Sequence, residues 1–346
     1  MTKTRKITYG VLLAVTAALL VLGVFFDTAI DDKLFQPDNV MAKVMEYVGF
    51  FPPFVFVSSA FAVLFFLVKG EDKNRILKKT LLVAGAALSY FFFGFTGTET
   101  AFESILPRLL VSLGAAVLLT PLTFLVFRRK SEETLKRLSI FLIFASIVAI
   151  VSSLISINVL KYIWGRPRYR EMIADGDYLL EAFTPWYKIN GFTLHGHHSF
   201  PSGHTAAASN LLVLCALEEV FPDAERRKGT VVFLVAIYIV AMAYSRMILG
   251  AHFLSDVAGG FLIAFLTYAI ARYVYFDKSR IVVEHLIKIN SAAFAVGENA
   301  TEEPLAEAGA AEAAEAEDGN EALSDEEAPI AAEEAQEEDA THIENP

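Results

Sequence analysis

Cysteine is nearly absent from this chain: its 346 residues include only Cys215, which lies within an apolar run. A single cysteine excludes an internal disulfide framework and a zinc site built from several cysteines. Charged residues are also sparse, at 20% of the chain, whereas 55% of the residues are hydrophobic and the mean hydropathy is +0.47. An ordinary soluble domain is not this apolar, so we expect a membrane protein.

Lys, Arg, Phe, Trp and Tyr are absent from the last stretch, 298–346, which contains eighteen Asp and Glu. The formal net charge of the whole chain is -11, so the other 297 residues carry about +7, with 29 Lys and Arg against 22 Asp and Glu. A one-signed stretch rich in Ala and Glu predicts a disordered acidic tail. Binding of a basic partner and simple solubilisation are both open interpretations of this tail.

Apolar runs of about 20 residues recur along the rest of the chain, and this length is what a helix needs to cross a bilayer. They predict an all-α, polytopic transmembrane helix bundle with about eight spans. Residues 27–49 are expected to form a polar connection between the first two spans. The expected spans are 7–26, 50–68, 80–95, 105–127, 138–160, 204–220, 230–244 and 253–275.

Lys and Arg concentrate at the N-terminus and in the connectors 69–79, 128–137 and 222–229. If every span crosses, all of these lie on one side, which the positive-inside rule identifies as cytoplasmic. We therefore expect cytoplasmic N- and C-termini in a bacterial inner membrane. The loops 161–203 and 245–255 would then both face the extracytoplasmic side.

The stretch 245–256 places three ionisable residues between two apolar runs, where charged groups are costly and mark functional sites. His252 and Asp256 are four residues apart, so they share one helical face, and the carboxylate would fix the imidazole tautomer. Arg246 offers a planar fork that suits phosphate oxygens. A satisfied polar patch at a helix end is the structural alternative for this stretch alone.

Two other stretches carry similar chemistry. Lys161 and Arg168 are seven residues apart, or two helical turns, and Pro167 stops the helix from continuing regularly. Ser202, Gly203 and His204 precede an apolar helix whose free N-terminal amides favour an anion. A basic helix end that reaches lipid headgroups and a turn that caps a helix are the respective structural alternatives.

Together, Lys-x6-Arg, Pro-Ser-Gly-His and Ser-Arg-x5-His-x3-Asp resemble the three signature motifs of the type-2 phosphatidic acid phosphatase superfamily over roughly residues 138–276. The first motif departs from the pattern, because Tyr169 stands where the family has proline. The resemblance implies a six-helix phosphatase core. The expected organisation is an N-terminal pair of helices in 1–70, the core in 71–276 with its motifs in 161–256, and a juxtamembrane segment and tail in 277–346.

The resemblance also implies a role for each motif residue. His252 would be the nucleophile that forms a phosphohistidine, Asp256 would orient it, and His204 would be the general acid and then the base. No metal and no other cofactor is implied, because fixed cations and backbone amides would stabilise the phosphoryl group. The residues expected to bind the phosphate are Lys161, Arg168, Ser202, Gly203 and Arg246.

Several polar residues near the motifs stay outside these roles. His195, His197 and His198 form a cluster that we expect to shape substrate entry, with a transition-metal site as the alternative. Arg166 and Arg170 are expected to flank the site near lipid headgroups without a catalytic role.

These observations predict an integral membrane phosphatase whose substrate is a lipid with a terminal phosphate or diphosphate. Phosphatidic acid, phosphatidylglycerol phosphate, an isoprenoid diphosphate and a lipid A phosphate are the substrates considered. A lipid phosphotransferase with the same site is the first alternative, and an anion transporter or binding protein is the second. The expected partners are the lipid substrate and the bilayer, and no nucleic acid.

Overall fold

The computed structural model describes residues 2–69, 74–99, 101–174, 183–193 and 196–279, together with 282, 284 and 288. These residues are mainly helical and include no β-strand, so the predicted all-α class is confirmed for them. The chain divides into Met1–Ser291 and Ala292–Pro346. The predicted acidic tail lies outside the described residues, and the predicted division at residue 70 stays a prediction.

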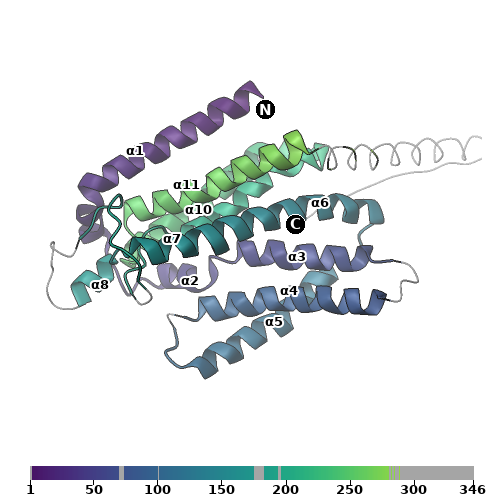
Figure 1. Ribbon diagram of the computed structural model, residues 1–346, viewed down its shortest axis with the longest axis horizontal. Coiled ribbons are helices and arrows are strands. Elements are labelled where there is room, and N and C mark those ends of the chain that lie inside the picture. Colours follow the sequence, from purple (N-terminus) through teal and green to yellow (C-terminus); the bar gives the residue numbers. More distant parts are fainter. Residues whose placement is uncertain are drawn as a thin grey trace, which may run out of the picture. The chain divides into compact units, whose positions relative to one another are not determined.

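Seven helical segments of the described chain are long and apolar enough to cross a membrane (Figure 1). Several of them consist of shorter helices that follow one another directly or after a few residues. The segments are α1 (Lys3–Leu34); α2 (Val40–Val48) with α3 (Pro52–Leu67); α4 (Arg75–Gly97); α5 (Ile105–Phe127); α6 (Glu132–Ala149) with η1 (Ile150–Ser156), α7 (Ile157–Trp164) and α8 (Tyr169–Ala174); η4 (Pro222–Arg227) with α10 (Lys228–Ile248); and α11 (Leu254–Arg272) with η5 (Tyr273–Lys278).

The sixth expected span is built differently from the others. Its residues form α9 (Gly203–Ser209) and the 3-10 helix η3 (Asn210–Glu219), each too short to cross a bilayer alone. Because a 3-10 helix rises about 2 Å per residue, the two in succession reach roughly 30 Å, close to the thickness of the hydrocarbon core. Asn210, at the junction, is buried and bonded to the hydroxyls of Ser152 and Ser153.

The first helix is longer than hydropathy predicts. The expected polar connection at 27–49 is wrong, because α1 continues to Leu34 and α2 occupies Val40–Val48. Asp27 and Asp31 lie on the inner face of α1, with exposed fractions of 1% and 0%. Hydropathy predicts that such carboxylates lie outside a span, because it depends on residue type alone and takes no account of tertiary contacts that bury them.

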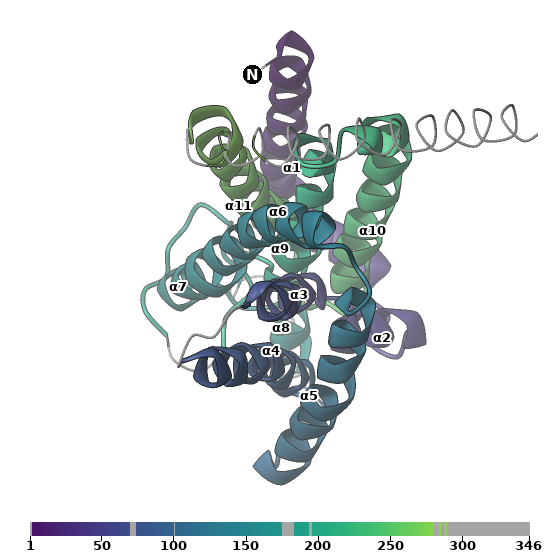
Figure 2. The ribbon, with the colours of Figure 1, turned by 90° about the vertical axis from the view of Figure 1, so that its right-hand side faces the viewer.

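The interior of the bundle is formed by large apolar side chains of several helices. Val63 of α3, Phe144 and Val148 of α6, and Phe265 of α11 are fully or almost fully buried in one cluster. Figure 2 shows α3 between α6 and α4, consistent with its packing against both. Many outer side chains are equally apolar, as a lipid-facing surface requires, so close packing of the interior rather than water exclusion holds such helices together.

Glycine permits the close approach of α11 to α9. A methyl group on Gly260 would overlap the carbonyl oxygen of Ser202. The backbone of Ser202 is held by its own N–H, which donates to the carbonyl of Asp256 at 2.9 Å. The contact therefore sets the distance between two motif segments.

Gly260→Ala should destabilise the fold by about 1–3 kcal/mol, because the new methyl group must push α11 away from α9. Thermal unfolding in detergent measures the effect. Gly114→Ala in α5 is the matched control, since nothing lies within 4 Å of its new methyl group and alanine favours a helix. Equal melting temperatures for the two variants would contradict the close contact.

Candidate active site

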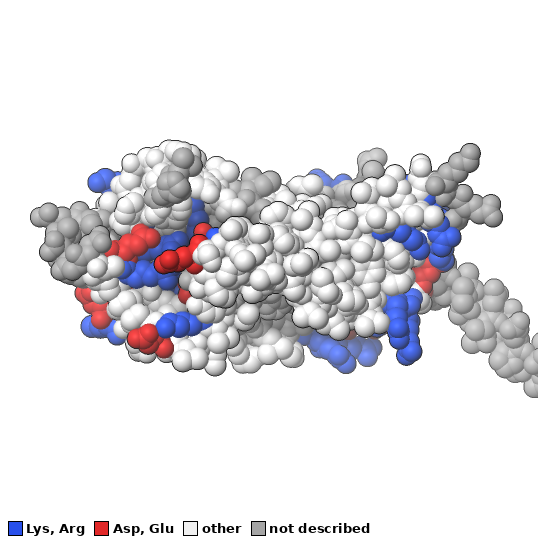
Figure 3. All heavy atoms as spheres, turned by 90° about the horizontal axis from the view of Figure 1, so that it is seen from below, with Lys and Arg blue, Asp and Glu red and all other residues white. Residues whose placement is uncertain are grey.

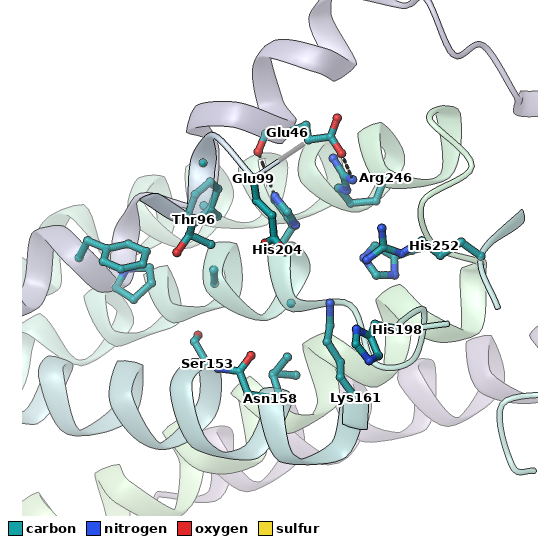
Figure 4. A pocket seen from close by; sticks show the side chains of 18 of the residues that line it. Glu46, Thr96, Glu99, Ser153, Asn158, Lys161, His198, His204, Arg246 and His252 are labelled. Atoms are coloured by element: carbon teal, nitrogen blue, oxygen red, sulfur yellow. Dashed lines mark hydrogen bonds and ion pairs between the residues drawn. The ribbon is translucent and has the colours of Figure 1, made fainter. Parts of the chain in front are cut away.

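The three predicted motifs meet at one end of the bundle, around a cavity of about 490 Å³. Figure 4 shows charged and imidazole side chains converging on it, and Figure 3 shows Lys and Arg beside Asp and Glu in a hollow on the surface. Six of the eight predicted site residues line the cavity: Lys161, Arg168, Gly203, His204, Arg246 and His252.

Helix ends and tight turns bring these side chains together. Lys161 lies in the last turn of α7, Arg246 in the last turn of α10, and His204 in the first turn of α9. His252 lies in the loop between α10 and α11, after Gly250, whose φ of +57° suits glycine. A methyl group there would also lie 2.9 Å from the ring of Phe35, so this turn requires glycine.

The ring of His252 is held in one tautomer. Its Nδ1 lies 2.6 Å from the carbonyl oxygen of Ser199, and a carbonyl can only accept, so Nδ1 carries the proton. Nε2 therefore keeps a free lone pair. The ring is only 2% exposed. Burial lowers the pKa of His252 well below its usual value, and the neighbouring cations Lys161 and Arg246 lower it further, so the neutral imidazole dominates at pH 7.

Asp256 orients this ring indirectly. The expected hydrogen bond from the His252 ring to the carboxylate of Asp256 is not formed, because Nδ1 and Oδ2 are 3.9 Å apart. Instead, Oδ2 accepts from the hydroxyl of Ser199 and, at 2.8 Å, from the N–H of Phe253. The carboxylate thus holds both the residue that binds the ring and the residue that comes after His252 in the chain.

Arg166 is part of the interior rather than a residue at the lipid headgroups. It is 0% exposed, and its guanidinium pairs with Asp256 and, at 2.8 Å, with Asp27 of α1. The expectation that Arg166 touches headgroups is therefore wrong. Burial of an arginine requires charged partners, and the two carboxylates supply them.

Glu46 of α2 is a site residue that the motifs do not include. Its Oε1 lies 2.8 Å from Nη2 of Arg246 and 3.3 Å from Nη1 of Arg170. Its carbonyl oxygen lies 3.0 Å from Nε2 of His204, which fixes the proton on that nitrogen and leaves Nδ1 free. The sequence offers no motif signal for Glu46, because this residue lies in the stretch 27–49 that is expected to be a polar connection.

Arg246 keeps donors available in the cavity. It is 1% exposed, and its Nε and Nη1 have no hydrogen-bond partner among the described residues. Lys161 reaches the same place, since a methyl group on Gly203 would lie 3.6 Å from its Nζ. Cationic donors that converge in this way favour an anion with several oxygens.

Ser202 is the predicted phosphate ligand that does not line the cavity. It is fully buried at the N-cap of α9, where its Oγ accepts from the N–H of Thr205 at 3.3 Å. Capping satisfies one amide of the helix and leaves the amide of Gly203 at the cavity wall. A direct contact between Ser202 and phosphate stays a prediction.

The histidine cluster is only partly described. His198 lines the cavity, and Nδ1 of His197 lies 3.6 Å from Oε2 of Glu171. His195 is outside the described residues. Among the residues that the structure describes, no group of three or more His, Cys, Asp or Glu is arranged to hold a metal ion.

The part of the chain that carries the motifs is similar to a family of known proteins. Residues 140–280 match the PAP2 superfamily. The resemblance predicted from the motifs is therefore confirmed for this part of the chain. The matched region, 140–280, contains every predicted site residue, whereas Asp27 and Glu46 precede this region.

A curated relative is also similar to part of the chain. Phosphatidylglycerophosphatase B of Haemophilus influenzae is 29% identical over 115 residues, which are 33% of this chain. The match spans about half of that relative, 47% of its length. No solved structure matches the chain.

Glu46→Gln should strengthen the binding of inorganic phosphate by roughly fivefold, or about 1 kcal/mol, because it removes the carboxylate that competes for Arg246. Titration calorimetry in detergent measures the dissociation constant. Asp38→Asn is the matched control, since the side chain of Asp38 is 96% exposed and pairs with Lys43. Weaker phosphate binding by Glu46→Gln would mean that Glu46 orients Arg246 for the anion.

Proposed function

We propose that this protein is a membrane phosphatase that hydrolyses a terminal phosphate or diphosphate of a lipid through a phosphohistidine on His252. The observation that carries the proposal is the free Nε2 of His252 in a cavity with Lys161, Arg168 and Arg246. A nucleophilic nitrogen beside fixed cations is the arrangement that phosphoryl transfer needs. The PAP2 match supports the same reaction class.

In the first step, the Nε2 lone pair of His252 attacks phosphorus, and the bond from phosphorus to the leaving oxygen breaks. His204 enters this step as the imidazolium, with a proton on each ring nitrogen, because the negative charge of the bound phosphate favours the protonated ring. The leaving oxygen takes the proton from Nδ1 of His204, while Nε2–H stays bonded to the carbonyl of Glu46. Lys161, Arg168 and Arg246 bind the phosphoryl oxygens and stabilise the charge spread over them. The carbonyl of Ser199 accepts from Nδ1–H of the resulting phosphohistidine.

In the second step, His204 takes a proton from water, whose oxygen attacks the phosphorus of the phosphohistidine. The bond from phosphorus to Nε2 breaks, and the electron pair returns to the imidazole of His252. Inorganic phosphate leaves, and His204 again holds the proton that it donates in the next turnover. The reaction uses fixed cations and the Gly203 amide rather than a metal ion.

A lipid substrate suits a site at the end of a helical bundle. Apolar side chains from other helices, including Phe50 and Phe54, line the cavity beside its cations. Lys and Arg also gather at the end of the molecule away from the hollow that holds them beside Asp and Glu (Figure 3), which supports an extracytoplasmic site in a bacterial inner membrane. The relative's name makes phosphatidylglycerol phosphate the first substrate to test, followed by phosphatidic acid, isoprenoid diphosphate and lipid A phosphate.

The detergent-purified protein should release free phosphate from at least one of these lipids in the presence of EDTA. His252→Ala should reduce the rate by at least about 10⁴-fold, because no other described side chain occupies the position of its free nitrogen. Malachite-green detection of phosphate measures the rate, and gel filtration shows that the variant is folded.

Full activity of His252→Ala would overturn the mechanism. Absence of phosphate release by the wild type would overturn hydrolysis, and adding acceptor lipids then tests the phosphotransferase. Phosphate transfer to an acceptor lipid that depends on His252 would identify that second reaction.

His252 should react with diethyl pyrocarbonate with a midpoint below pH 6.5, since only the neutral imidazole reacts. The pKa of His252 is lowered, so the neutral form is present above the lowered value and is lost as the pH falls through it. Mass spectrometry of the labelled peptide measures the midpoint, with a histidine-containing reference peptide labelled in parallel. A midpoint at or above that of the reference peptide would contradict the burial of a neutral ring.

A further inference from the structure

Helix α1 reaches the site through a buried carboxylate. Asp27 is 1% exposed and accepts from Arg166 at 2.8 Å. It also accepts from the backbone N–H of Ser255 at 3.0 Å and from the hydroxyl of the same residue. Ser255 lies in the first turn of α11, where free amides favour a negative charge. Asp27 therefore ties α1 to Arg166 and to the helix that carries Asp256.

A glycine of α1 lies against the first turn of α11. A methyl group on Gly23, one turn before Asp27, would lie 2.6 Å from Cβ of Ser255 and 2.9 Å from Oδ1 of Asp27. Gly10, earlier in the same helix, has nothing within 4 Å. The glycine at position 23 thus permits the contact that Asp27 makes.

The contacts continue from α1 to the nucleophile without a gap. Asp27 pairs with Arg166, and Arg166 pairs with Asp256. Asp256 then holds the hydroxyl of Ser199, whose carbonyl accepts from Nδ1 of His252. Each of these five residues is at most 2% exposed, so water does not screen the charges.

We propose that Asp27 is a positioning residue for His252 and acts through Arg166 and Asp256. The N-terminal helix, which precedes the PAP2 match, is then part of the structure that prepares the nucleophile. This inference rests on the proposed function only for its kinetic effect. Its effect on the imidazole itself can be measured without any substrate.

The sign of that effect follows from the charges. Arg166 with two carboxylates has a net charge of -1, and Asp27→Asn makes the group neutral. The protonated imidazole then loses stabilisation, so the pKa of His252 falls further. The other ionisable groups around His252 stay in place in this variant. They are Lys161, Arg168, His204 and Arg246, the carboxylate of Asp256, and Glu46, Glu99, Arg170 and His198, which line the same cavity.

Two measurements on the full-length, detergent-purified protein test the proposal. Asp27→Asn should lower kcat for lipid phosphate hydrolysis by about 10- to 100-fold with KM within about twofold, because the misplaced ring still leaves the phosphate cations intact. It should also move the diethyl pyrocarbonate midpoint of His252 to lower pH. Asp32→Asn is the matched control on the same helix, since Asp32 is exposed and accepts from the hydroxyl of Tyr169 at 2.7 Å.

A second pair of variants leaves every charge in place. Gly23→Ala should lower kcat because the methyl group separates Asp27 from α11, whereas Gly10→Ala on the same helix should not. If Asp27→Asn does not fold, the comparison of Gly23→Ala with Gly10→Ala tests the positioning role instead. Equal kcat for Gly23→Ala and Gly10→Ala would then overturn the proposal.

The outcomes separate this proposal from the proposed function. An unchanged kcat and an unchanged midpoint in Asp27→Asn would overturn the positioning role. The role would also be overturned if the midpoint were unchanged and the lost activity matched the fraction of protein that fails to fold. A shifted midpoint in a protein whose wild type releases no phosphate would support the positioning role and overturn the function.

Discussion

The carboxylate of Asp256 is the constraint on which the site depends. Its two oxygens accept from Arg166, from the hydroxyl of Ser199 and from the N–H of Phe253, while its carbonyl accepts from Ser202. One buried residue thus joins the segment of each motif. A buried charge needs this many donors, because each unpaired oxygen would cost free energy away from water. The geometry of His252 is therefore a consequence of how Asp256 is satisfied.

The buried cations of the cavity need partners that offset the free-energy cost of their burial. Arg246 is 1% exposed and would be costly without a partner, and Glu46 supplies one while leaving two guanidinium nitrogens available. The same carboxylate residue holds His204 through its backbone. A site that binds a multiply charged phosphoryl group needs excess positive charge, and a helix outside the matched region moderates that excess. The helices α1 and α2 thus contribute to the electrostatics of a pocket whose motifs lie elsewhere.

Much of this architecture could be predicted because the signals are local. Apolar runs of bilayer length identified the helical bundle, and the spacing of Lys161, Arg168, His204, Arg246 and His252 identified side chains that line one cavity. The errors arose where a charged residue is buried among partners from other parts of the chain. Asp27 ended the first expected span eight residues early, and Arg166 was assigned to the headgroups. Hydropathy assigns both to water because it contains no information about a partner elsewhere in the chain.

The sequence by itself determined the all-helical class of the described residues, the match of residues 140–280 to the PAP2 superfamily and the residue types around the cavity. It did so because bilayer thickness and motif spacing act over short stretches of chain. Only the tertiary structure decided how His252 is held, and that α1 and α2 take part. The contact of Asp27 with Arg166 joins residues 139 apart, and that of Glu46 with Arg246 joins residues 200 apart. Packing alone creates such pairs, since no periodicity or spacing relates the two partners.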